Sequence, residues 1–196
     1  MDDSTISAIN RAKEETKKKH KKLAKLCIPI VVLFLVVFVF NMPTDEILVR
    51  AGTFQMGDTQ NDGFIWQTPV HTVNLTYDYY IGRYEVTNKS YITYLNESEV
   101  SSNGKLNTKK HIDMDNSYCE IGYANGGFYL KKGQKQAPVI EVTWWGAIGY
   151  CNWLSEKKGL PKAYDSGGNL LDKNGNKTTD ITAVMGYRLP TEAEWE

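Results

Sequence analysis

The ten residues Tyr187–Glu196, which read YRLPTEAEWE, carry the clearest local structural signal in the chain. Thr191 and Glu194 have the Thr-x-x-Glu spacing of a capping box, in which each side chain bonds the other residue's backbone N–H at a helix start. Acids at 192 and 194 also suit the positive end of the helix dipole. Arg188 is predicted to bind a buried carboxylate or a backbone turn beside this box. Because so short a helix cannot stabilise itself, we expect a continuation or a packing partner, and a domain that is incomplete at its C-terminus.

Two earlier stretches share one arrangement, an extended segment followed by a capped helix. Residues 139–142 favour a short strand, Thr143 can cap the next helix, and an apolar stripe then continues to Gly159, a typical helix stop. Tyr79–Val86 favours an aromatic-rich strand that leads to a second cap at Thr87. We therefore predict two capped helices, each preceded by a strand.

The other segments favour strands and loops. Ile47–Val49, residues 51–58 and His71–Leu75 show the alternation or the glycine punctuation of strands. Residues 97–137 are polar and rich in Gly and Asn, so we predict a long surface excursion there. Asp172–Asn176 contains Asn-Gly, which favours a tight turn.

An uncharged apolar run at Leu26–Met42 (LCIPIVVLFLVVFVFNM) predicts a transmembrane helix. As a helix it reaches about 25 Å, slightly less than the ~30 Å hydrocarbon core of a bilayer. Residues 1–26 hold eight basic and four acidic residues, whereas acids follow the run directly. By the positive-inside rule we expect a cytoplasmic basic tail at 1–25, a signal anchor at 26–42 that contacts membrane lipid, and an extracytoplasmic domain at 43–196. This domain would face the periplasm or the cell surface.

Two other interpretations of the apolar run stay open, a cleaved signal peptide and a buried helix of a soluble protein. Against the first, a signal peptide usually has a much shorter basic region, and NMPTDE at 41–46 lacks a small-x-small cleavage pattern. The chain beyond residue 26 holds fifteen basic and nineteen acidic residues. It therefore lacks the basic surface typical of nucleic-acid binding, and we expect no nucleic-acid partner.

No residue of the chain is predicted to be catalytic, cofactor-binding or metal-binding. His71 has no second ligand at metal spacing. Cys119 and Cys151 could pair in an oxidising compartment or stay buried thiols. Four acids are interpreted as helix caps and structural ion pairs, and five tryptophans as core residues in preference to a sugar or peptide groove. The acids are Glu85, Glu141, Glu192 and Glu194, and the tryptophans are Trp66, Trp144, Trp145, Trp153 and Trp195.

Five motifs in order across residues 47–196 resemble the formylglycine-generating enzyme family, also called the sulfatase-modifying factors. They are AGTFQMG at 51–57, TPVHTV at 68–73, YEVTN at 84–88, the strand-and-helix segment at 138–151, and the signature at 187–196. The resemblance implies an α+β fold related to C-type lectins. It also implies copper-dependent oxidation of a sulfatase cysteine to formylglycine.

The resemblance places the family's copper-binding cysteine pair and calcium-binding loops beyond the signature. It therefore implies copper and calcium for the full-length domain and neither in this chain. Neither Cys119 nor Cys151 matches a catalytic cysteine, although Cys151 matches a helix cysteine that some relatives bond to one near their C-terminus.

Three functions remain open. The full-length protein could be an oxidase that modifies cysteine in an exported, sulfatase-like client. The domain could instead be a non-catalytic, lectin-like module that binds a surface ligand. A sulfoxide synthase with non-haem iron is the third, but it needs a histidine-rich helical domain upstream, and residues 1–46 contain only His20. We expect the chain alone to be inactive in the family reaction.

Overall fold

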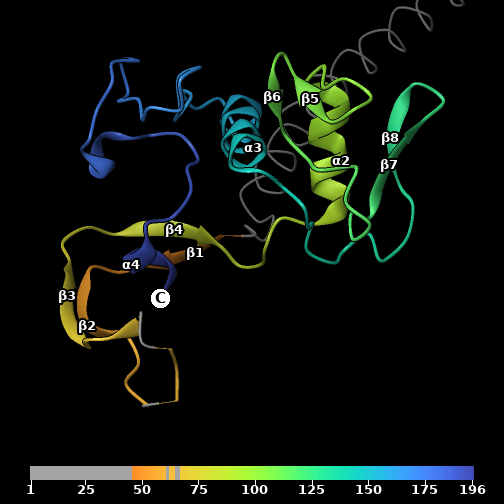
Figure 1. The fold of residues 1–196 in the computed structure, drawn as a ribbon. Helices are drawn as coiled ribbons and strands as arrows, with labels where there is room; N and C mark the ends of the chain where they lie inside the picture. The colour runs from red at the N-terminus through yellow and green to blue at the C-terminus, as the bar shows by residue number, and fades with distance from the viewer. Residues whose placement is uncertain (1–45, 61, 65–66) are drawn as a thin grey trace, which may run out of the picture. The chain divides into compact units, whose positions relative to one another are not determined.

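The computed structural model describes residues 46–60, 62–64 and 67–196 (Figure 1). All of them belong to one compact unit, Asp45–Glu196. Within these residues, no helix combines the length and the apolar character that crossing a bilayer requires. The predicted cytoplasmic tail at 1–25 and the predicted anchor at 26–42 lie outside the described residues.

The first four strands form two antiparallel ladders. Strand β1 (Glu46–Val49) pairs with β4 (Tyr79–Gly82), with Glu46 opposite Gly82, and β2 (Gly52–Met56) pairs with β3 (His71–Leu75). The predictions for Ile47–Val49, for residues 51–58 and for His71–Leu75 are therefore confirmed as strands. The strand predicted at Tyr79–Val86 is shorter than expected, because β4 ends at Gly82.

Both predicted caps are confirmed. Thr87 accepts a hydrogen bond from Ser90 N at the start of α2 (Asn88–Glu97), and Thr143 accepts one from Gly146 N at the start of α3 (Trp144–Lys157). Just beyond the end of α3, Gly159 has a φ of 71°, a left-handed conformation that glycine adopts readily.

The prediction of a surface excursion at 97–137 holds only in part, because most of these residues are exposed or half-buried but several enter the core. This segment forms two hairpins, β5 (Lys105–Leu106) with β6 (Lys109–Lys110), and β7 (Ile121–Ala124) with β8 (Gly127–Leu130). In Figure 1 helix α2 lies between these hairpins. Five side chains of the segment pack with α2 in the first hydrophobic core, namely Val100, Ile112, Cys119, Ile121 and Phe128. A few apolar side chains thus bring parts of this segment into the core, although its overall composition is polar.

The prediction of a strand at 139–142 is wrong. Only isolated bridges occur there, from Pro138 to Thr87 and from Val142 to Ile112. Glu141 has a φ of 62°, and this left-handed conformation interrupts an extended run. The segment is therefore tied to two neighbours at separate points and not along a ladder.

The stretch between α3 and the signature forms two similar turns and, together with α3, a second core. Asp165 and Asp172 each accept backbone N–H bonds from the residues two and four positions further on. The predicted turn at Asp172–Asn176 is confirmed, with a bridge from Leu171 to Lys177 across it. The second core consists of Ile148, Cys151, Ala163 and Tyr164. A short 3₁₀ helix (Ile181–Ala183) and α4 (Glu192–Trp195) complete the described elements.

Candidate functional site

The signature folds around a buried carboxylate, that of Glu194. Arg188 donates two hydrogen bonds of 2.6 Å to it, one to each oxygen. Thr191 N donates another over 2.8 Å, and the capping box predicted from the sequence is present in full. Tyr77 donates its hydroxyl to Glu194 Oε1 over 2.9 Å, and Tyr79 donates to the Glu194 carbonyl. The prediction that Arg188 binds a buried carboxylate is confirmed.

The charge of Glu194 is stabilised despite its burial. Burial raises the pKa of Glu194, but the bonds from Arg188, Thr191 and Tyr77 outweigh it and hold the pKa at about 2. Burial and the neighbouring carboxylate raise the pKa of Tyr77, so its hydroxyl stays protonated and donates. The cluster is an ion pair with every acceptor position used. It leaves no oxygen for a substrate, and we assign it a structural role.

Two further bonds join the signature to the first strands. Tyr187 donates its hydroxyl to Glu46 at the start of β1, and Gly57 N donates to Glu196 Oε1 over 2.7 Å. These partners are far apart in the chain, so the sequence had no local signal for them. The signature therefore closes the domain onto its first two ladders.

A second polar group lies inside the first core. The ring of His111 is buried, and its Nδ1 contacts the hydroxyl of Tyr94. Burial raises the pKa of Tyr94, so its hydroxyl donates and the His111 nitrogen accepts. Burial, aided by the charge of Lys109, lowers the pKa of His111. Tyr91 also donates to the His111 carbonyl over 2.9 Å. His111 was not among the residues predicted to be functional, because a lone histidine in a polar segment carries no local signal.

The two described cysteines do not fit a copper site. Linear Cu(I) needs two thiolates that face one metal ion, but Cys119 belongs to the first core and Cys151 to the second. Both are free thiols, with exposed fractions of 0% and 8%. Burial raises the pKa of Cys151 to about 12, so it stays protonated at neutral pH. No cluster of three or more His, Cys, Asp or Glu in the described part of the chain could hold a metal ion.

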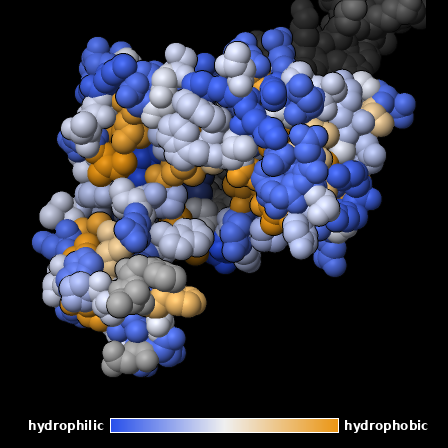
Figure 2. Space-filling view, viewed as in Figure 1, coloured by the Kyte–Doolittle hydropathy of each residue, from blue (hydrophilic) through white to orange (hydrophobic). Residues whose placement is uncertain are grey.

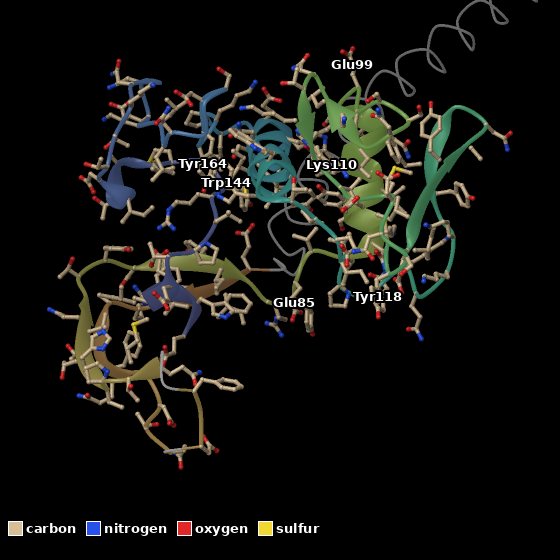
Figure 3. The ribbon with its side chains drawn as sticks, in the orientation of Figure 1. Glu85, Glu99, Lys110, Tyr118, Trp144 and Tyr164 are labelled. Atoms are coloured by element: carbon tan, nitrogen blue, oxygen red, sulfur yellow. The ribbon has the colours of Figure 1, made fainter. Side chains whose placement is uncertain are left out.

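The structure distributes the other candidate residues over the surface. His71 is exposed, and its Nδ1 contacts the Pro69 carbonyl. Glu85 is exposed in the segment between β4 and α2 (Figure 3), and Glu192 is exposed in the first turn of α4. Glu141 accepts a bond from Asp113 N through its carbonyl. These residues do not meet at a common site.

The prediction that tryptophans fill the core holds only in part. Trp153 packs against the first core and Trp145 against the second, whereas Trp144 and Trp195 are exposed. Trp144 is the first residue of α3 and lies near Tyr164 (Figure 3), with ring centroids 6.5 Å apart. Trp66 lies outside the described residues. Figure 2 shows apolar residues in small separate patches on this face of the molecule.

Comparison with known proteins gives one family match and several distant relatives. Residues 39–196 match the FGE-sulfatase model, a sulfatase-modifying factor enzyme 1-like domain. Chaperone protein LppX of Paenibacillus barcinonensis is 31% identical over 160 residues, which cover 78% of this chain and 44% of LppX. The formylglycine-generating enzyme of Thermomonospora curvata is 26% identical over 153 residues, which cover 76% of this chain and 46% of that enzyme. The chain thus spans less than half the length of these relatives.

The solved structure of CarF is similar over 78% of this chain and 55% of its own, with 24% identity and a TM-score of 0.45. PvdO from Pseudomonas aeruginosa is similar over 60% of this chain and 42% of its own, with 23% identity and a TM-score of 0.41.

Proposed function

The chain belongs to the FGE-sulfatase family of sulfatase-modifying factor enzyme 1-like domains, and on this premise we propose that it is the membrane-anchored, amino-terminal portion of an extracytoplasmic domain of this kind. The apolar run at 26–42 would be the signal anchor, with the basic tail in the cytoplasm. The folded residues would serve as the scaffold of the domain. The Glu194 cluster supports a scaffolding role, because all acceptor positions of its carboxylate are occupied by groups of the protein itself.

For the full-length protein we propose the family activity, oxidation of a cysteine in an exported, sulfatase-like client to formylglycine. The family match is the observation that carries this proposal. Copper would have to be bound by residues other than Cys119 and Cys151, because neither thiol is accessible to a metal ion or a client. The same holds for calcium, since the described residues provide no group of acidic ligands.

A non-catalytic binding module is the second candidate function. It is favoured by the buried state of both described cysteines. It also agrees with the name of chaperone protein LppX, which is similar to this chain over 78% of its residues. Such a module would hold an exported protein or a surface ligand without changing it.

The experiment that separates these functions compares the chain 1–196 with the longest product of the same gene. Each is incubated with Cu(I), oxygen and a cysteine-containing client peptide, and the peptide is analysed by mass spectrometry. Formylglycine made only by the longer product supports the oxidase. Peptide binding without conversion by either product supports the binding module. If the chain 1–196 converts the peptide without any further part of the protein, the scaffold role is contradicted.

Topology is tested separately with an alkaline phosphatase fusion after Glu46. We expect an active phosphatase outside the cytoplasm, and an inactive one would contradict the anchor.

A further inference from the structure

Three large apolar or aromatic side chains are exposed close to the end of β4. Tyr84 is 73% exposed and Val86 is 37% exposed, although both lie in the short segment between β4 and α2. Val139 N donates to the Val86 carbonyl over 2.9 Å, which brings the next residue, Ile140, beside the same segment. Ile140 is 42% exposed. We call Tyr84, Val86 and Ile140 the Tyr84 patch.

The patch lies at the end of the domain where the chain enters it. Glu46, the first described residue, is opposite Gly82 in the β1–β4 ladder. Tyr84 follows Gly82 by two residues, so it lies within about 7 Å of that end of the ladder. The position of the patch is therefore tied to the position of Glu46.

The length of chain before Glu46 limits how far the domain can stand from the membrane. The apolar run ends at Met42, and only residues 43–45 separate it from Glu46. Three residues span at most about 10 Å. A headgroup layer is about 5–8 Å thick, judged from the thicknesses of the hydrocarbon core and of the whole bilayer. Glu46 would thus lie no further out than about the outer edge of the headgroups, with the patch within reach of them.

From these distances we propose that the Tyr84 patch rests in the headgroup layer of the membrane that anchors the chain, an inference that rests on the anchor in the proposed function. Tyrosine suits this layer, because its ring prefers the apolar side while its hydroxyl stays hydrated. Arg83 and Glu85 flank Tyr84 and are exposed. These charged side chains are compatible with hydrated headgroups, but inserting them into the hydrocarbon core is unfavourable. They therefore limit the depth of the contact to the headgroup layer.

The test measures the depth of single labelled positions in the full chain, reconstituted in phosphatidylcholine vesicles. The background is Cys27→Ser, in which the buried Cys119 and Cys151 escape an environment-sensitive thiol dye. The dye is attached at Tyr84→Cys or Ile140→Cys. Tyr129→Cys is the matched control, because Tyr129 is also an exposed tyrosine but belongs to β8. Near-ultraviolet circular dichroism checks that each variant is folded.

We expect lipid spin-labelled at the headgroup to quench most of the fluorescence at 84 and 140 and little at 129. Aqueous iodide should show the opposite pattern. If iodide reaches all three positions equally and the lipid quenches none, the proposal is overturned. Protection from iodide without lipid quenching would also overturn it, because another protein copy would then cover the patch.

Flotation of the same vesicles after carbonate extraction keeps the two ideas apart. A chain that floats without lipid quenching refutes the patch contact alone. A chain that does not float refutes the anchor, and the patch contact with it.

Discussion

At the residue scale, Glu194 holds the signature together, because both of its carboxylate oxygens and its carbonyl are bonded. Glu194→Gln leaves Arg188 without a charged partner in a site where the Glu194 side chain is 0% exposed. Breaking a buried pair from one side costs about 3–5 kcal/mol, so we expect a loss near 3 kcal/mol of unfolding free energy. Urea unfolding of the full chain in non-ionic detergent measures it. The control is Glu192→Gln, an exposed acid of the same helix, and an equal loss in both variants would contradict this assignment.

Glu194 also predicts the acid sensitivity of the fold. Its pKa is about 2 when folded, below the ordinary glutamate value, so the unfolded chain binds the proton first as pH falls. The stabilisation is therefore complete above about pH 4.5 and is lost as pH falls towards 2, by up to about 3 kcal/mol. Urea unfolding across this pH range should show a slope that Glu194→Gln flattens. An unchanged slope would place the acid sensitivity elsewhere.

Protonation of His111 should reduce the stability of the fold at a higher pH than protonation of Glu194 does. Its pKa is lowered by burial and by Lys109, so the folded state favours the neutral ring. The stability is full above the unfolded value of about 6.5 and declines as pH falls below it. Tyr94→Phe removes the only donor that contacts His111 Nδ1 among the described residues. We expect this variant to lose about 1 kcal/mol at pH 8, measured by thermal unfolding, with the exposed Tyr129→Phe unchanged.

At the scale of elements, Ser155 connects α3 to the signature. Its hydroxyl donates to the Cys151 carbonyl within the helix and accepts from Tyr187 N, both over 2.8 Å. Ser155→Ala leaves a part-buried backbone N–H without its acceptor, which costs about 1–3 kcal/mol. Chemical unfolding should show this loss. Ser166→Ala, in an exposed turn, is the control and should change stability by less than about 0.5 kcal/mol.

The helix starts that the sequence predicts correctly have their hydrogen-bond partners close in the chain. Thr87, Thr143 and Thr191 cap helices through residues three positions away, so their spacing alone is sufficient. The segment at 97–137 lacks such local partners, because its β7–β8 hairpin contacts α2 and its strand β6 contacts α3. Its burial depends on where a neighbouring helix lies, and average polarity carries no such information.

At the scale of the whole molecule, the same limit applies to the candidate site. Arg188 was predicted to bind a buried carboxylate or a backbone turn, and its partner Glu194 is only six residues away. Tyr77 lies 117 positions and Tyr79 lies 115 positions before Glu194. Nothing in the sequence around either tyrosine indicates which distant carboxylate it will bind. The family match spans residues 39–196 and therefore covers both ends of these bonds, although it names no contact between them.

The two cysteines provide a test of the whole fold. Cys119 and Cys151 belong to different cores and are both free in the structure, so each should react with a thiol reagent only when the domain opens globally. We expect iodoacetamide to label both at the same slow rate, and urea to accelerate both equally. Peptide mapping by mass spectrometry separates them from Cys27. Fast labelling of one cysteine would mean that its core opens independently. If neither cysteine were labelled in urea without reductant, the two would form a disulfide, and the assignment of two structural thiols would be wrong.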